Sequence, residues 1–177
     1  HSGGFPGQIT RTLVDPATGL TVSVLTNAVD GPADALAVGL VELIDLLAHD
    51  AADGQALPAG VTTDDLDRLT GRYVSLWGET DVIRAGERLV LIDPGTPGPR
   101  DRMHELRALD ATTFLPEDED GFGASGERIP FDLGDDGRVV RMRVSGVSSW
   151  PEEDYLARRG DAWGHRSAAG RGVTGRD

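Results

Sequence analysis

The sequence has 177 residues, of which 38% are hydrophobic, and this length allows one or two small hydrophobic cores. All 17 basic residues are Arg and stand against 30 acidic residues, so the net charge of −13 repels phosphate backbones and disfavours nucleic-acid binding. Cys is absent, which excludes disulfides and thiolate chemistry, and no segment has the ~20 apolar residues that membrane insertion requires.

The first seven residues, H-S-G-G-F-P-G, precede the first strand-like segment. They contain neither an initiator Met nor a basic or apolar leader. We therefore expect that His1 is not the natural start of the protein.

Residues 8–27 predict a β-hairpin. Its strands are Gln8–Val14 and Leu20–Thr26, and Asp15–Gly19 between them holds the Pro and Gly typical of a turn. A helix is predicted to begin at Gly31-Pro32, because Pro is favoured at the first helical position. Its apolar residues recur at spacings of three and four: Leu36, Leu40, Leu43, Ile44 and Leu47. We expect this apolar face to pack on the hairpin.

The stretch His49–Thr63 is rich in Ala, Asp, Gly and Pro and is predicted to be a linker. Short strands follow it, with no helix predicted between them and with tight turns at Gly86-Glu87 and Gly134–Gly137. These strands are Arg72–Trp77, Thr80–Arg84, Arg88–Ile92, Glu105–Leu109, Thr113–Leu115, Arg128–Leu133, Arg138–Val144 and Val147–Trp150. The pattern predicts a small antiparallel β-barrel or sandwich. We expect Gly160–Asp177, which has almost no apolar anchor, to be mobile.

The order of elements in the first fifty residues carries a family resemblance. His1-Ser2-Gly3 is followed by Gly4–Gly7 as a predicted turn, and Leu20–Asn27 ends in L-T-N before the helix. This order resembles the C-terminal end of the penicillin-recognising serine hydrolases, which include class C β-lactamases, D-Ala-D-Ala carboxypeptidases, D-aminopeptidases and related esterases. In that family a K-T-G or H-x-G triplet lies on the strand beside the active site. The resemblance implies an α+β fragment, a hairpin plus terminal helix, of a serine β-lactamase-like transpeptidase domain.

The resemblance implies a role for each of the first four residues. His1 stands at the Lys or His position and Ser2 at the hydroxyl position, where side chains orient the substrate carboxylate or the proton network. Gly3 completes the triplet, and the backbone N–H of Gly4 is one donor to the oxyanion of an acyl-transfer reaction. His in place of Lys favours an esterase or peptidase-like member over a β-lactamase.

The groups that would start the reaction are absent from these residues. Because the sequence has no Lys, it contains no S-x-x-K, and neither Tyr73-Val74-Ser75 nor Tyr155-Leu156-Ala157 matches Y-x-N. We expect the nucleophile and its base to lie upstream of residue 1, and the chain by itself to be inactive.

The later strands carry a second resemblance. Leu69-Thr70-Gly71-Arg72-Tyr73, then G-E-R-L-V-L-I-D, and then I-P-F-D-L-G-D-D-G-R-V-V-R-M-R-V resemble the lipocalin-like β-barrel that follows the catalytic domain in many such hydrolases. The interior of an eight-stranded barrel is filled by side chains or holds one small ligand. We expect four large aromatic residues of this region to be core residues: Trp77, Phe114, Phe131 and Trp150.

Other polar residues have a simpler interpretation. Glu117–Asp120 lacks the spacing of an EF-hand loop and is predicted to be a solvated acidic loop. His49, His104 and His165 are far apart in sequence and lack zinc-site spacing. We therefore predict no cofactor and no metal site.

The sequence thus predicts four regions: the end of a transpeptidase-like domain at residues 1–50, a linker at 51–63, a lipocalin-like barrel at 64–157 and a disordered tail at 158–177. The predicted function is that of the C-terminal portion of a serine hydrolase acting on a small-molecule ester, amide or peptide. The alternative is a non-catalytic barrel module that binds a small molecule or a protein partner. Substrate, oligomeric state and localisation do not follow from the sequence.

Overall fold

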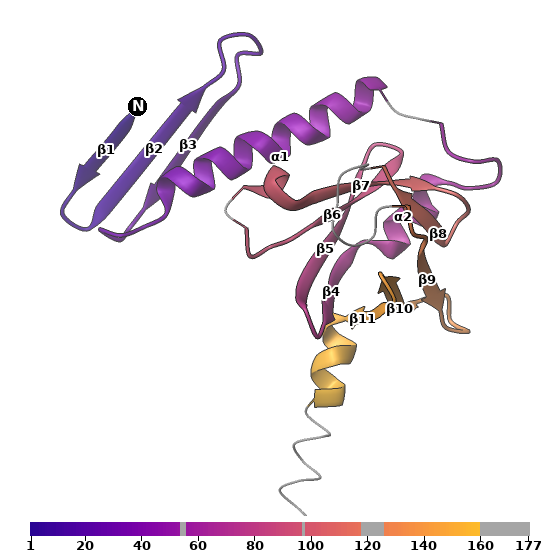
Figure 1. Ribbon diagram of the computed structural model, residues 1–177. Coiled ribbons are helices and arrows are strands. Elements are labelled where there is room, and N and C mark those ends of the chain that lie inside the picture. The colour runs from indigo at the N-terminus through magenta and orange to yellow at the C-terminus, as the bar shows by residue number, and fades with distance from the viewer. Residues whose placement is uncertain (54–55, 97, 118–125, 160–177) are drawn as a thin grey trace, which may run out of the picture.

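The structure is a computed structural model that describes residues 1–53, 56–96, 98–117 and 126–159. It contains a three-stranded sheet, a closed eight-stranded barrel and a long helix, α1, that lies between them (Figure 1). Among these residues no helix is long and apolar enough to cross a membrane.

The three-stranded sheet is antiparallel in the order β1-β2-β3. Its strands are β1 (Ser2–Phe5), β2 (Gln8–Val14) and β3 (Thr21–Thr26), so the predicted hairpin is confirmed. Gly4 and Phe5, which were expected in a turn, belong to β1 instead. The turn is Pro6-Gly7 alone, and Gly7 adopts a φ of +91° that glycine allows without strain.

Helix α1 (Ala33–Asp53) packs on β2 and β3 with its small residues. Ala33 and Ala37 are fully buried there, so the helix approaches the sheet closely. The predicted packing of the helix on the hairpin is confirmed, but its large apolar residues are covered only in part. Four of them remain between 39% and 49% exposed: Leu36, Leu40, Ile44 and Leu47.

The later part of α1 contacts the outer surface of the barrel. Leu46 is buried against Ala85, Val90 and Ile92, and Leu43 is partly buried beside them. The helix therefore joins sheet and barrel through two different sides. Arg100 adds an ion pair with Asp45 of α1.

The predicted antiparallel barrel is confirmed. Its hydrogen-bonded order is β10-β11-β4-β5-β6-β7-β8-β9, closed by the pairing of β9 with β10. The strands are β4 (Gly71–Ser75), β5 (Gly78–Ala85), β6 (Arg88–Ile92), β7 (Met103–Ala108), β8 (Thr113–Pro116), β9 (Ile129–Leu133), β10 (Val139–Val144) and β11 (Val147–Pro151). A short 3-10 helix, η1 (Pro99–Arg102), which was not predicted, lies between β6 and β7.

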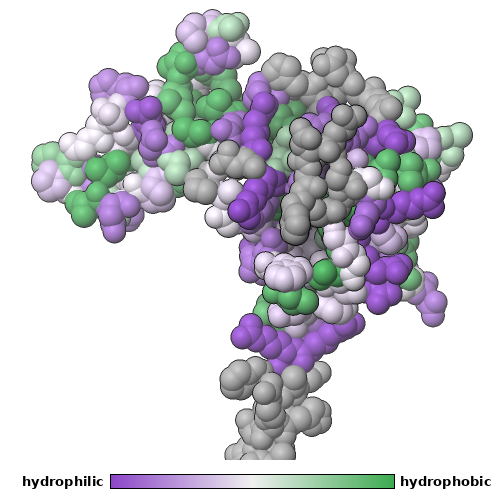
Figure 2. Space-filling view, viewed as in Figure 1, coloured by the Kyte–Doolittle hydropathy of each residue, from purple (hydrophilic) through white to green (hydrophobic). Residues whose placement is uncertain are grey.

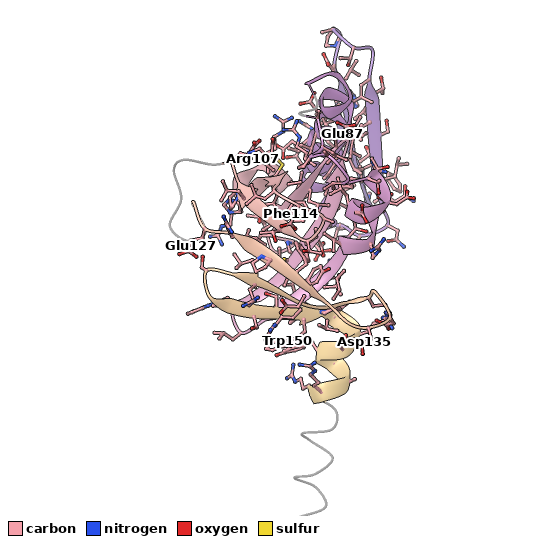
Figure 3. The ribbon with its side chains drawn as sticks, turned by 90° about the vertical axis from the view of Figure 1, so that its right-hand side faces the viewer. Glu87, Arg107, Phe114, Glu127, Asp135 and Trp150 are labelled. Carbon is pink, nitrogen blue, oxygen red and sulfur yellow. The ribbon has the colours of Figure 1, made fainter. Side chains whose placement is uncertain are left out.

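The barrel interior is filled by apolar side chains. Phe114 lies at its centre (Figure 3) and meets Phe131 edge to face, with ring centroids 5.6 Å apart. Tyr73 also meets Phe131 edge to face, with ring centroids 5.8 Å apart. Trp77 contradicts the prediction that it is a core residue. It is 80% exposed at the tip of the β4–β5 hairpin, where a two-residue turn has no interior side.

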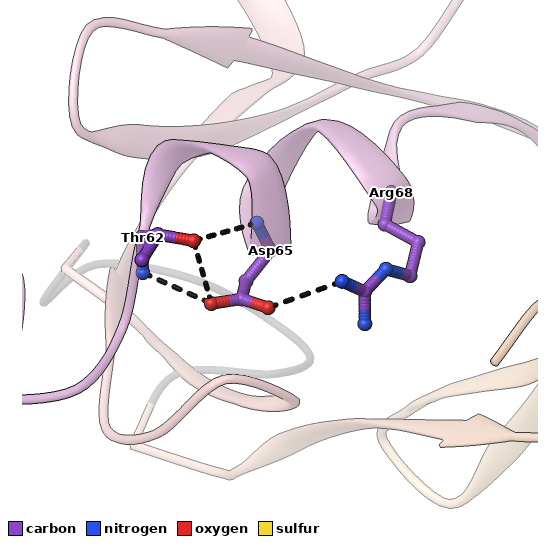
Figure 4. A network of polar contacts seen from close by, with 3 residues as sticks. All are labelled: Thr62, Asp65 and Arg68. Carbon is purple, nitrogen blue, oxygen red and sulfur yellow. Dashed lines mark hydrogen bonds and ion pairs between the residues drawn. The ribbon is translucent and has the colours of Figure 1, made fainter.

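A second helix, α2 (Thr63–Leu69), covers one end of the barrel with Leu66 and Leu69, which are buried in the barrel core. It lies where the predicted linker meets the barrel. Its start is fixed by a capping box: the Thr62 hydroxyl accepts from the N–H of Asp65, and the Asp65 carboxylate accepts from the N–H of Thr62 (Figure 4). The Thr62 hydroxyl also donates to the Asp65 carboxylate, and this hydrogen bond, followed by the one from the Thr62 N–H, lowers the pKa of Asp65.

Residues 152–159 form a further helical segment after β11. Its Tyr155 stacks on Trp150 with ring centroids 6.5 Å apart, and the guanidinium of Arg158 lies over the same indole. Trp150, which was predicted to be a core residue, is only partly buried, because it lies at the rim of the barrel (Figure 3). The tail predicted to be mobile, residues 160–177, lies outside the described residues.

Candidate functional site

Of the residues predicted to carry the chemistry, Ser2, Gly3 and Gly4 lie on β1, one of the two edge strands of the small sheet, and His1 directly precedes it. His1 and Thr12 form a reciprocal hydrogen-bonded pair. The terminal amino group of His1 donates to the Thr12 carbonyl, and the Thr12 N–H donates to the His1 carbonyl, both over 2.8 Å. This pair determines which residue pairs of the β1–β2 ladder are hydrogen-bonded and which are not.

In an antiparallel ladder, hydrogen-bonded and non-hydrogen-bonded pairs alternate. Because His1–Thr12 is hydrogen-bonded, Ser2–Arg11 and Gly4–Ile9 are the non-hydrogen-bonded pairs. The backbone N–H and C=O groups of Ser2 and Gly4 therefore point away from β2, along the free edge of the sheet.

Side chains alternate along the same strand, so the four predicted site residues do not share one face. Ser2 and Gly4 lie on the face of Arg11, whose guanidinium makes an ion pair with Asp34 of α1 at 2.9 Å. His1 and Gly3 lie on the opposite face, with Thr10 and Thr12. The structure thus brings the edge backbone groups of Ser2 and Gly4 together and separates the side chains of His1 and Ser2.

The two glycines differ in the space beside them. A Cβ atom on Gly3 would meet the Thr10 hydroxyl at 2.9 Å, which is too close. A Cβ atom on Gly4 would meet the flexible end of Ile9 at 3.3 Å. Gly3 is therefore required by the close approach of β2, whereas the position of Gly4 accepts a small side chain.

Chemically, the edge of β1 offers N–H donors at fixed positions on a rigid element. Such donors can bind a carbonyl oxygen or stabilise an oxyanion. The edge has no Lys to serve as a base, because the sequence has none. Arg11, which the sequence interpretation did not select, is the cation nearest in register to Ser2, and only the strand register identifies it.

A second candidate is a pocket of the barrel, lined in part by the core residues Leu106 and Ala108. It lies beside residues 56–58 and includes Arg88 and Arg107. Each guanidinium is already paired, Arg88 with Glu105 and Arg107 with Glu117, so the pocket presents balanced charges. It has no evident preference for a charged ligand.

Within the described ranges, no three His, Cys, Asp or Glu side chains are grouped so that they could hold a metal ion. Asp118–Asp120 and His165, part of the earlier interpretation, lie outside those ranges.

Among the comparisons with known proteins, the one with solved structures finds similarity. No family model matches the chain, and no curated protein sequence matches it. Among solved structures, the chain is similar to an octameric penicillin-binding protein homologue from Pyrococcus abyssi, with 16% identity and a TM-score of 0.37. The alignment covers 84% of this chain and 32% of that one, so the chain spans about a third of that protein's length. A TM-score this low does not establish a shared fold.

Proposed function

We propose that this chain is the C-terminal portion of a serine hydrolase of the β-lactamase and D-Ala-D-Ala carboxypeptidase type. In this proposal β1 borders the active site, and the substrate is a small ester, amide or peptide. One observation carries it: the His1–Thr12 pair directs the N–H of Gly4 outward from an open sheet edge. An acyl-transfer enzyme needs such a donor where the carbonyl oxygen becomes negatively charged.

The chain's own residues would take limited roles in that reaction. The Gly4 N–H would donate to the oxyanion, and the outward C=O and N–H of Ser2 would hold the extended part of a substrate. The nucleophile and its base would come from residues outside this chain, because S-x-x-K requires a Lys. The barrel would add no chemistry, since its interior is filled by side chains such as Phe114 and Leu106.

The alternative is a non-catalytic barrel module. The barrel fold is compatible with it, but side chains fill the interior, which leaves little room for a ligand. The balanced pairing of Arg88 and Arg107 does not indicate a specific small molecule. The edge of β1 gives the hydrolase the better support.

The test uses the full-length protein encoded by the gene. An S-x-x-K and a Y-x-N encoded before His1 are expected, and their absence would contradict the proposal. Gly4→Pro removes the outward N–H without removing a β1–β2 hydrogen bond, and should lower kcat for an ester substrate by ~10² to 10³. Gly4→Ala keeps the N–H and has only the flexible end of Ile9 beside it, so it is the matched control. Equal kcat values for Gly4→Pro and Gly4→Ala would contradict the proposal that the Gly4 N–H stabilises the oxyanion.

A further inference from the structure

The Gly3–Gly4 peptide group connects the interior of the small sheet with its open edge. In the β1–β2 ladder, Gly3–Thr10 is the next hydrogen-bonded pair after His1–Thr12, so the C=O of Gly3 points towards β2. The peptide bond is trans, and the N–H of Gly4 therefore points in the opposite direction, out of the sheet. A hydrogen bond to the Gly3 oxygen on the inner side thus acts on the same peptide group as the N–H on the outer side.

The Gly3 oxygen accepts two hydrogen bonds from one residue. The N–H of Thr10 donates to it as part of the ladder, and the Thr10 hydroxyl also donates to it, over 3.3 Å. A carbonyl oxygen has two lone pairs, so it can accept both donors at once. The hydroxyl bond is partly buried, so the local dielectric weakens it less than at a fully exposed position.

The lack of a side chain at position 3 makes this arrangement possible. A Cβ atom on Gly3 would lie 2.9 Å from Oγ1 of Thr10, so a larger residue would push the hydroxyl away. Thr12 lies on the same strand and the same face, but its hydroxyl pairs with Ser23 of β3 over 3.0 Å. Of these two Thr hydroxyls, the one of Thr10 is bonded to the Gly3–Gly4 peptide.

We propose that Thr10 is a positioning residue that strengthens the Gly4 N–H as a hydrogen-bond donor. When a peptide carbonyl accepts a hydrogen bond, its electrons shift towards the oxygen, and the N–H of the same peptide becomes more polar. The hydroxyl also restricts the rotation of this peptide, so the N–H stays directed at one point outside the edge. Thr10 acts from the inner side of the peptide and contacts no substrate itself.

The inference rests on the proposed hydrolase function, in which the Gly4 N–H faces an oxyanion. The edge is open in the described part of the chain. β1 is the strand of the small sheet farthest from the barrel (Figure 1), and no other element stands beside it at the outer border of the molecule in the same view (Figure 2). A stronger donor at this edge matters most when negative charge develops on the acyl oxygen. Thr10 should therefore affect kcat and not KM.

The first test is kinetic and uses the full-length protein with an ester substrate. Thr10→Val replaces the hydroxyl by a methyl group of similar size. One hydrogen bond changes the strength of the next by about 10–30%, and loss of an oxyanion donor costs ~10² to 10³ in kcat. Thr10→Val should therefore lower kcat about two- to eightfold at an unchanged KM. Thr10→Ser keeps the hydroxyl and should restore most of the rate, whereas Thr12→Val, the matched control, should leave kcat unchanged.

A double-mutant cycle shows whether Thr10 acts through Gly4. In the Gly4→Pro background the donor is gone, so Thr10→Val should have no further effect on kcat. In the Gly4→Ala background, which keeps the N–H, the effect of Thr10→Val should persist. If Thr10→Val leaves kcat unchanged, or slows all backgrounds by the same factor, the inference is overturned while the proposed function stands. If Gly4→Pro is as active as Gly4→Ala, the proposed function itself fails.

The second test is spectroscopic and does not require activity. In NMR spectra of residues 1–177, the resonance of the Gly3 carbonyl carbon moves to higher field when a hydrogen bond to its oxygen is lost. Thr10→Val should produce this shift, and Thr12→Val should not. If circular dichroism shows that Thr10→Val unfolds the sheet, Thr10→Ala removes the same hydroxyl with a smaller side chain. A Gly3 resonance that is the same in the wild type and in the Thr10 variant would overturn the inference, because the hydroxyl would then not be bonded to this carbonyl.

Discussion

The hydroxyl of Tyr73 donates a hydrogen bond to the carbonyl oxygen of Leu69 over 2.8 Å, and both residues are buried. The Leu69 carbonyl belongs to the last turn of α2, where helix carbonyls lack partners within the helix. The phenol supplies this partner inside the barrel. It thereby joins the helix that covers the barrel end to the first barrel strand.

Tyr73→Phe should lower the free energy of unfolding by ~1 to 3 kcal/mol, because it leaves a buried carbonyl without a hydrogen bond while preserving the ring. Urea denaturation measures the change. Tyr155→Phe is the control, since that ring lies at the barrel rim against Trp150. Equal stability of the wild type and Tyr73→Phe would mean that the Leu69 carbonyl finds another partner.

Burial also raises the pKa of Tyr73 above its ordinary value of about 10. In the unfolded chain this phenol loses its proton first as the pH rises, so the unfolded state is favoured. The stabilisation is complete below about pH 10 and is lost progressively above it. Denaturation between pH 9 and pH 12 should show a steeper loss of stability for the wild type than for Tyr73→Phe.

Thr62→Ala should destabilise the barrel by ~1 kcal/mol, because it removes the hydroxyl that caps α2. The effect reaches the core, since α2 carries Leu66 and Leu69 into it. Thermal unfolding measures the change, and Thr63→Ala, one residue into the helix, is the control. A larger loss for Thr63→Ala would show that the cap is not what holds α2.

The Asp132 carboxylate should stabilise the folded state at neutral pH and lose this effect at acidic pH. The hydrogen bond from Arg141, and then the charges of Arg141 and Arg143, lower the pKa of Asp132. As the pH falls below about 4, the unfolded chain takes up this proton first, so the contribution present at neutral pH disappears. Asp132→Asn should cost ~1 kcal/mol at pH 7, and this cost should become smaller as the pH falls below about 4. Asp135→Asn, exposed in the adjoining turn, should cost little at either pH.

Residues 1–177 alone should not hydrolyse chromogenic esters, D-amino-acid amides or β-lactams, because the chain lacks S-x-x-K. Incubation with a fluorophosphonate or β-lactam probe, followed by mass spectrometry, measures covalent labelling. Stoichiometric labelling of a Ser in this chain would place a nucleophile within it and contradict the proposed division of the active site.

The sequence predicted the barrel strands well because each is short, alternates inward and outward residues, and is bounded by turn residues. β6 was equally clear for another reason. Leu89 and Leu91 face the interior while Val90 and Ile92 face α1, so the strand is buried on both sides and appears as a continuous apolar run. Such runs mark buried strands whatever lies on the second side.

Among the features that were not predicted, three have a clear physical reason. α2 has seven residues and only two apolar ones, too few for a helical period, although Thr62 and Asp65 at capping-box spacing could have indicated it. Trp77 was assigned to the core because large aromatic residues are usually buried, but its position in a two-residue turn decides its exposure. The side of α1 that meets the sheet is set by Ala33 and Ala37, since small residues allow close approach.

The candidate site was only partly accessible to sequence reasoning. The residues His1–Gly4 could be selected by resemblance, but the direction of their backbone groups depends on which residue of β2 lies opposite each of them. That register brings Arg11 to the side of Ser2 and separates the His1 and Ser2 side chains. No pattern within the first four residues contains this information.

Helix α1 also determines how the barrel is oriented relative to the edge of β1. It meets the sheet through Ala33 and Ala37 and the barrel through Leu43 and Leu46, with continuous helix between. Each helical residue adds about 100° of rotation and about 1.5 Å of rise. One residue inserted after Gly39 would therefore turn the barrel by about 100° around the helix axis, whereas seven residues, about two turns, would restore the angle and move it about 10 Å along the axis. The number of residues in this one helix thus sets the angular phase between the two halves of the molecule.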